Sequence, residues 1–284
     1  MRLLERRSLF KRKAPGTAHT IQLIAANVDT LFIVTSCNAD FNPARLERYL
    51  VLAHTAGCHP VVVLTKADQI DDPAAAVDQV RAIAPGVDVV AVSTVSGLGI
   101  EAIARRVSAG RTVALMGLSG IGKSTLVNEL TDGVVQRTGE VRAADQRGRH
   151  TTVTRDLIPL PSGGFIIDTP GIREIGLWQA YEGMAKTFPE ISSEVEQCRF
   201  TDCDHDNEPG CAVQAALASG SIPERRLEHW QDLMAELAMQ DEQLEDYARR
   251  SESRDRADAE RRRDSERPNK RARTKPKKRG KRKR

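Results

Sequence analysis

No apolar run in this chain approaches the ~20 residues that a membrane-spanning helix needs. Residues 1–13 carry charges where a secretion signal has an apolar stretch. The 5 cysteines are an odd number, and without a secretion signal they argue against a disulfide framework. These absences exclude the membrane-spanning and secreted disulfide-rich classes. They indicate a cytoplasmic protein with no membrane partner, and we expect it to be a monomer.

Charge is distributed unevenly along the 284 residues. Residues 249–284 hold 19 Lys/Arg against 6 Asp/Glu, a net charge of +13, which leaves −9 for the preceding 248 residues. This tail has no aromatic residue, so it lacks the groups on which bases stack. We expect a disordered basic tail that binds the phosphates of a polyanion without sequence preference. A solubilising extension is the alternative.

Short apolar runs alternate with helical patterns over the first two thirds of the chain. The expected strands are Leu31–Thr35, Val61–Thr65, Val89–Val92, Val113–Met116 and Phe165–Ile167, and the helices between them are Pro43–Ala56, Asp72–Ala84 and Gly99–Ala109. Such continuous apolar strands are typical of a parallel sheet covered on both faces. The fold class is therefore α/β, a doubly wound parallel sheet with its ligand at the carboxyl ends of the strands.

A phosphate-binding loop follows the fourth of these strands. Its residues are Gly117, Leu118, Ser119, Gly120, Ile121, Gly122, Lys123 and Ser124, which satisfy GxxxxGK[ST], and Thr125 follows in the helix that we expect to start at Ser124. Glycines let backbone N–H groups close around phosphates, Lys123 can reach the β and γ oxygens, and Ser124 offers a hydroxyl to Mg²⁺.

A base-reading motif, Thr65-Lys66-Ala67-Asp68, follows the second strand. The Asp68 carboxylate can accept two donors that guanine presents and adenine does not, while the stem of Lys66 lies against the ring. The usual first residue of this motif is Asn, so Thr65 leaves open which hydrogen bonds tether the loop. Ser93, at the end of the next strand, is the expected partner of the base loop.

Nucleotide-sensing residues are expected on both sides of the last strand. Asp168 of the Asp168-Thr169-Pro170-Gly171 motif would hold the Mg²⁺ shell, and the N–H of Gly171 would meet the γ-phosphate. Either Thr151 or Thr152 would supply a second hydroxyl to Mg²⁺. Ile172 stands where a water-orienting Gln is expected, which makes His150 a catalytic candidate; an exposed loop histidine is the alternative.

The order of these motifs is inverted relative to an ordinary GTPase. There the phosphate loop opens the domain and the guanine-reading motif closes it, whereas here the guanine-reading motif comes first and the Asp168 motif comes last. The sequence therefore predicts a circularly permuted P-loop GTPase domain. The permuted order also joins the Asp168 motif directly to the segment that follows the GTPase domain.

A zinc site is predicted after the permuted domain. Cys198, Cys203, His205 and Cys211 supply three thiolates and one imidazole, the donor set of a closed tetrahedral zinc site, with no position left for water. No strand is convincing after Gly171, and Pro223–Ala248 reads as one long helix. We expect a small helical module stabilised by one structural zinc ion. Cys37 and Cys58 are expected to be inert thiols.

Taken together, these motifs resemble the circularly permuted GTPases of the ribosome-small-subunit-dependent GTPase A family. The resemblance runs from about Arg2 to Leu237 and includes Ala26-Asn27-Val28-Asp29, Gly148-Arg149-His150-Thr151-Thr152 and Glu208-Pro209-Gly210-Cys211. It implies a GTPase with Mg²⁺ and zinc, stimulated by the 30S ribosomal subunit and its 16S rRNA, acting in late maturation of that subunit. It also implies an N-terminal OB-fold, of which only Leu3–Lys13 resembles the end.

The expected organisation is then an OB-fold remnant or linker over 1–20, a permuted GTPase domain over 21–175, a helical zinc-binding domain over 176–248 and the basic tail over 249–284. Two alternatives remain open. One is a non-hydrolysing RNA-binding adapter that GTP only stabilises, which Ile172 favours. The other is a P-loop ATPase or kinase.

Overall fold

The computed structural model describes residues 5–13, 21–37, 41–131, 156–168 and 176–266. The chain forms two compact units, Met1–Gln240 and Asp241–Arg284. Within the described ranges every helix is too short or too polar to cross a membrane.

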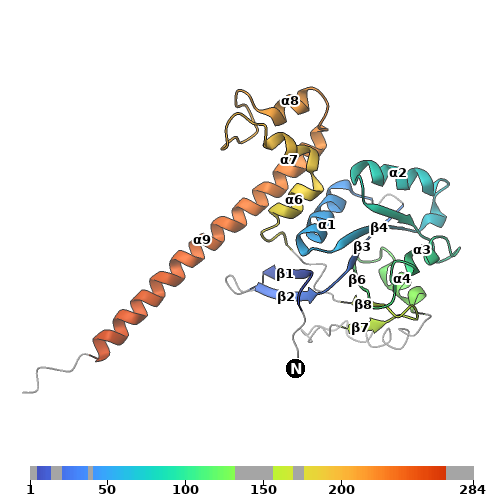
Figure 1. Cartoon of the computed structure of the whole chain (residues 1–284), viewed down its shortest axis with the longest axis horizontal. Coiled ribbons are helices and arrows are strands. Elements are labelled where there is room, and N and C mark those ends of the chain that lie inside the picture. Colours follow the sequence, from blue (N-terminus) through green and yellow to red (C-terminus); the bar gives the residue numbers. More distant parts are fainter. Residues whose placement is uncertain (1–4, 14–20, 38–40, 132–155, 169–175, 267–284) are drawn as a thin grey trace, which may run out of the picture. The chain divides into compact units, whose positions relative to one another are not determined.

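A six-stranded sheet forms the centre of the first unit (Figure 1), in the order β5-β4-β3-β6-β8-β7. Its strands are β3 (Thr30–Ser36), β4 (His59–Thr65), β5 (Asp88–Ala91), β6 (Thr112–Met116), β7 (Asp156–Pro159) and β8 (Phe165–Asp168). All neighbours pair in parallel except β7, which runs antiparallel to β8 at the edge. The expected doubly wound parallel sheet is therefore confirmed.

Helices α1 (Pro43–Ala56) and α2 (Pro73–Ile83) pack on one face of this sheet, and α3 (Ile100–Ala104) and α4 (Lys123–Leu130) pack on the other. A 3₁₀ turn, η1 (Ala67–Gln69), follows β4. The helices after β8 are α6 (Tyr181–Thr187), α7 (Pro189–Val195), α8 (Ala212–Ala218) and α9 (Glu224–Glu266). Alternate residues of β3 enter two separate cores. Ile33 packs in the core that contains α1, α2 and the helices after β8, and Phe32 packs in the core that contains α3 and α4.

Local signals explain the limits of α1. Asn42 caps its first turn by accepting a hydrogen bond from the Arg45 N–H, and Pro43 occupies the first helical position. The helix ends at Gly57, whose φ of 75° suits the left-handed conformation of a helix terminator. This helix separates the sheet from the helices that follow β8.

Three differences from the expected elements stand out. The edge strand β7 was not predicted. Two further strands, β1 (Leu9–Lys13) and β2 (Ile21–Ala26), pair with each other in a separate antiparallel sheet. The α-helical part of Gly99–Ala109 is restricted to α3.

The last helix is longer than expected. It continues past Ala248 to Glu266, inside the segment that we expected to be a disordered tail from residue 249. Residues 249–266 contain no Gly or Pro, and Arg249 forms an ion pair with Asp246 one turn away. Strong helix formers and charge pairs along one helix explain the extension, which stops shortly before Pro268. Residues 267–284 of the tail lie outside the described ranges.

Candidate functional site

The phosphate loop leaves β6 through three glycines whose backbone conformations other residues rarely adopt. Gly117, Gly120 and Gly122 have positive φ values of 155°, 75° and 106°. A Cβ atom on Gly117 would lie 2.2 Å from the carbonyl oxygen of Val34, so the loop passes directly over the end of β3. The loop is thereby held against the sheet where a ligand would meet it.

Lys123 opens α4 at the end of this loop. Its side chain is buried, and its ammonium group donates to the carbonyl oxygen of Gly117 at 2.9 Å and to that of Leu118. Ser124 and Thr125 follow in the first turn of α4 and are exposed. The amide N–H groups at the start of a helix and a neighbouring ammonium group favour an anion at this position.

Thr65 ties the base-reading loop to the phosphate loop. Its hydroxyl group lies 2.6 Å from the carbonyl oxygen of Ile121 and 3.0 Å from that of Thr35, and the side chain is buried. The tether that the sequence left open is therefore made by the threonine hydroxyl, which donates to the phosphate loop.

Asp68 and Ser93 lie together at the neighbouring strand ends. The Ser93 hydroxyl donates to Asp68 Oδ1 at 2.5 Å and accepts the N–H groups of Val95 and Ser96. Ser93 is buried, whereas Asp68 is exposed in the turn after Lys66. The carboxylate is therefore fixed through one oxygen and keeps the other for a ligand.

Four of the predicted site residues lie outside the part of the chain that the structure describes: His150, Thr151, Thr152 and Gly171. Asp168 ends β8, next to the β6 strand that carries the phosphate loop. Four of the predicted motifs thus follow the carboxyl ends of β4, β5, β6 and β8, as the sequence predicted.

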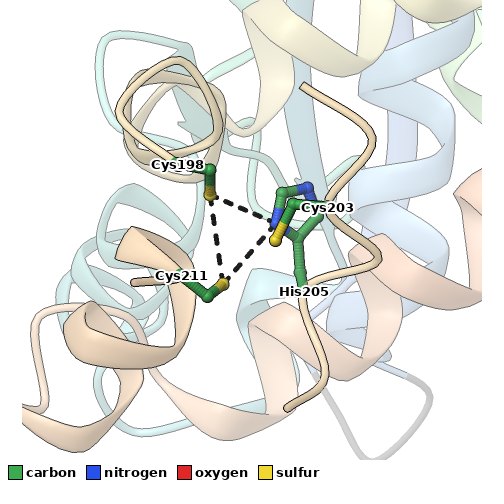
Figure 2. Close-up of side chains that lie close together, drawn as sticks. All are labelled: Cys198, Cys203, His205 and Cys211. Carbon is green, nitrogen blue, oxygen red and sulfur yellow. Dashed lines mark hydrogen bonds between the residues drawn. The ribbon is translucent and has the colours of Figure 1, made fainter. Parts of the chain in front are cut away.

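Cys198, Cys203, His205 and Cys211 converge on one point (Figure 2), and their ligand atoms lie within 4.8 Å of one another. Cys198 Sγ lies 3.9 Å from Cys211 Sγ, and His205 Nδ1 lies 3.5 Å and 3.7 Å from these two sulfurs. A tetrahedron with zinc–sulfur bonds of about 2.3 Å has sulfur atoms about 3.8 Å apart. The donor set and its spacing therefore fit a zinc ion.

Surrounding groups hold these ligands in place. Gln214 donates to the carbonyl oxygen of His205 at 2.6 Å, and the ring of His205 packs edge-on against Trp230 of α9. The Glu208 carboxylate accepts the backbone N–H groups of Asp204 and Asp206, which closes the loop between the ligands. Such fixed orientation is typical of a structural metal site.

The other two cysteines lie apart from this cluster. Burial raises the pKa of Cys58 to about 12, and burial together with the negative charge of Asp68 raises the pKa of Cys37. Both thiols therefore stay protonated at neutral pH, which agrees with the inert role expected for them.

A buried polar cluster, which the sequence analysis did not predict, joins α9 to α1. The fully buried Glu47 accepts hydrogen bonds from Arg225 and Arg226 and lies 2.6 Å from His229 Nδ1. Arg226 also binds Glu190 and the carbonyl oxygen of Thr187 at 2.7 Å. The signal in the sequence is weak, because Glu47 stands next to Arg48 between the apolar residues of α1.

The helices around the zinc ligands also pack closely on α1. A Cβ atom on Gly183 of α6 would lie 2.4 Å from the carbonyl oxygen of Val51. Phe188, Leu227 and Trp230 belong to the same core as the apolar residues of α1. The residues that hold the zinc ligands and those of the sheet therefore share one continuous core within the first unit.

Comparison with known proteins gives consistent matches. The model of the RsgA GTPase family matches residues 3–178. A small ribosomal subunit biogenesis GTPase RsgA from Methanosarcina acetivorans is 46% identical over 243 residues, covering 86% of this chain and 66% of that protein. An RsgA 2 protein of the same description from Vibrio parahaemolyticus is 49% identical over 241 residues, covering 84% and 66%. The chain thus spans about two thirds of the length of these relatives.

Solved structures agree with these matches. YjeQ from Thermotoga maritima superposes with a TM-score of 0.61 at 28% identity, covering 84% of this chain and 78% of that one. YloQ, described as a circularly permuted GTPase, superposes with a TM-score of 0.53 at 26% identity, covering 82% and 79%.

Proposed function

Because the chain belongs to the RsgA GTPase family, we propose that it binds Mg²⁺-GTP at the carboxyl ends of β4, β5, β6 and β8 and hydrolyses it on the small ribosomal subunit. One observation carries most of this proposal: Thr65 joins the guanine-reading loop to the phosphate loop, so both ends of one nucleotide are met at a single edge of the sheet. The permuted order of the chain leaves that arrangement intact.

Each predicted residue then has a role. The loop from Gly117 to Gly122 would surround the phosphates, and Lys123 would exchange its two carbonyl partners for β and γ oxygens. Asp68, oriented by Ser93, would accept the guanine donors beside Lys66.

The remaining groups serve the metal and the reaction. Bound Mg²⁺ would neutralise phosphate charge, with Ser124, Asp168 and Thr151 or Thr152 as its holders and Thr125 beside them. The Gly171 N–H would sense the γ-phosphate. His150 would position the attacking water, since Ile172 has no polar group with which to do so.

The cluster of Cys198, Cys203, His205 and Cys211 would hold one structural zinc ion. Zinc would supply no chemistry to the reaction, because all four positions of a tetrahedral ion are taken by side chains. The ion would fix α7 and α8 against α9, because these two short helices are too small to form a stable core alone.

We propose the 30S subunit and its 16S rRNA as the partner, because the matched relatives are described as small ribosomal subunit biogenesis GTPases. The zinc-binding helices and the basic tail of net charge +13 offer the rRNA contact. We further propose that the protein acts in the cytoplasm during late maturation of the small subunit. We propose that it does so as a monomer.

Single-turnover GTP hydrolysis with and without 30S subunits tests this function. We expect a low rate alone and a rate at least about tenfold higher with 30S subunits, and no turnover by the Lys123→Ala variant, which lacks the phosphate contact. A chain that binds GTP tightly but hydrolyses it no faster with 30S subunits would be the non-hydrolysing adapter instead.

A further inference from the structure

An exposed aromatic side chain lies on the loop between the first two predicted zinc ligands. Phe200 stands between Cys198 and Cys203, and 42% of its surface is exposed. The guanidinium carbon of Arg199 lies 5.3 Å from the centre of the Phe200 ring. The loop therefore presents an aromatic ring and a planar cation together at the surface of the protein.

Contacts with Gly210 hold this pair in place. The backbone N–H of Arg199 donates to the carbonyl oxygen of Gly210 at 3.2 Å. A Cβ atom on Gly210 would lie 3.2 Å from Cβ and 3.3 Å from Cδ of Arg199, so the stem of this arginine lies across the glycine. Because Gly210 directly precedes the ligand Cys211, the position of the pair is fixed relative to the zinc ligands.

The charge of this part of the chain makes the pairing unexpected. Among residues 198–211, Arg199 is the one Lys or Arg, and four residues are acidic, which gives a net charge of −3 without the cysteines. The acidic residues are Asp202, Asp204, Asp206 and Glu208. Within the described ranges no carboxylate forms an ion pair with Arg199, whose guanidinium group lies by the Phe200 ring instead. Arg199 and Phe200 therefore form a stacking surface and not part of a salt-bridge network.

The chemistry of this surface suits an unpaired nucleic-acid base. Bases that are turned out of a helix stack on aromatic rings and on guanidinium planes, and Phe200 and Arg199 offer one of each. The acidic side chains of the same loop repel phosphates, so the backbone of a bound strand must lie farther away. The basic tail, residues 249–284, has the opposite character, because it has many cations and no aromatic residue.

Resting on the 30S partner proposed above, we propose that Phe200 and Arg199 form a stacking site for one unpaired base of the small-subunit RNA. The tail neutralises phosphates without sequence preference, whereas the loop between the zinc ligands binds a base. The loop thereby gives the protein a defined place on the subunit that the tail cannot give. The two contacts also differ in their dependence on salt, because only the phosphate contact releases counterions.

The affinity for 30S subunits, measured with a non-hydrolysable GTP analogue over a range of salt concentrations, tests this site. Phe200→Leu keeps an apolar side chain but removes the ring, and should weaken binding about tenfold at every salt concentration. The slope of log affinity against log salt should stay that of wild type, because no phosphate contact is lost. Phe200→Trp should bind at least as tightly as wild type. Arg199→Lys keeps the charge without the planar group and should bind about threefold more weakly.

The matched control is Tyr181→Leu, which removes an equally exposed aromatic ring (44%) from α6 and should leave the affinity unchanged. Zinc content, measured for each variant, reports whether the loop between the ligands is intact. Photocrosslinking decides the partner independently, because it keeps an aromatic ring at the site. With p-benzoylphenylalanine in place of Phe200, we expect a crosslink to the 16S rRNA within the 30S complex.

Normal 30S affinity of Phe200→Leu would overturn the proposal and leave the proposed GTPase function standing. A crosslink to a ribosomal protein alone would also overturn it, since the surface would then bind a peptide. A smaller salt slope in Phe200→Leu would assign the loop to phosphates and contradict base stacking. A wild-type chain that does not bind 30S subunits would contradict the proposed function itself, and this inference with it.

Discussion

Replacement of Glu47 by glutamine removes one negative charge from the interior, between α1 and α9. The side chain is fully buried, and its carboxylate meets Arg225, Arg226 and His229. Glutamine has nearly the same shape and mimics the protonated acid, so the change isolates the charge. Since Arg226 is itself buried, it cannot turn to solvent when its partner is neutralised.

The pKa of Glu47 gives the size of the effect. Burial acts to raise it, but hydrogen bonds from His229 and Arg225 and the charges of Arg225 and Arg226 outweigh burial and lower it from 4.5 to about 2. At about 1.4 kcal/mol per pKa unit, ionised Glu47 contributes roughly 3 kcal/mol to the free energy of unfolding. Glu47→Gln should lose about this amount at pH 7.

The same shift fixes a pH window. Because the folded-state pKa lies below the unfolded one, the contribution of Glu47 is fully present above the unfolded value of 4.5 and is lost as the pH falls towards 2. Urea unfolding followed by the fluorescence of the buried Trp178 and Trp230 measures wild type and Glu47→Gln across this range. The difference in the free energy of unfolding between wild type and Glu47→Gln should disappear as the pH is lowered from about 5 to about 2.

Glu182→Gln is the matched control, because its carboxylate pairs with Lys186 in solvent and its neutralisation should leave the unfolding midpoint unchanged. Equal midpoints for wild type and Glu47→Gln at pH 7 would refute the reasoning. So would a difference between them that stays constant down to pH 2.

Three further changes have defined outcomes. Thr65→Val removes the hydroxyl that binds the Ile121 carbonyl and should weaken nucleotide binding about fivefold in a titration, whereas Thr65→Ser should bind normally. Gly117→Ala places a methyl group 2.2 Å from the Val34 carbonyl oxygen and should lower the free energy of unfolding by at least about 2 kcal/mol; normal urea stability would argue against the described loop. Cys211→Ser should reduce zinc, measured by mass spectrometry, from about one ion per chain to little or none, and should lower the melting temperature; an unchanged zinc content would exclude this cysteine as a ligand.

The elements that the sequence predicted well are those with strong local patterns. Strands β3 and β4 are continuous apolar runs because both of their faces are buried, and α1 is bounded by Asn42-Pro43 and Gly57. The resemblance to small-subunit-dependent GTPases is confirmed by the match to residues 3–178. The Cys₃His set was predicted from ligand type alone, and the structure brings its four side chains together.

The elements that were missed depend on distant partners. Strand β7 has four residues, ends in Pro159 and exists through its pairing with β8, so it has no pattern of its own. The Glu47–Arg226 contact joins positions 179 apart in the chain, and only the folded core makes them neighbours. The tail was judged by its charge, which suggested disorder, whereas residues up to Glu266 follow their helix propensity.

The nucleotide preference of the purified chain tests the central claim most directly, because every role proposed for the GTPase reaction depends on a guanine nucleotide site at the ends of β4 and β6. Equilibrium titration with GDP and ADP should show GDP binding at least about a thousandfold more tightly, since the Asp68 carboxylate would meet two donors of guanine that adenine does not present. Asp68→Asn should weaken GDP binding about a hundredfold while leaving the protein folded. Equal affinity for GDP and ADP, or normal GDP binding by Asp68→Asn, would contradict the account.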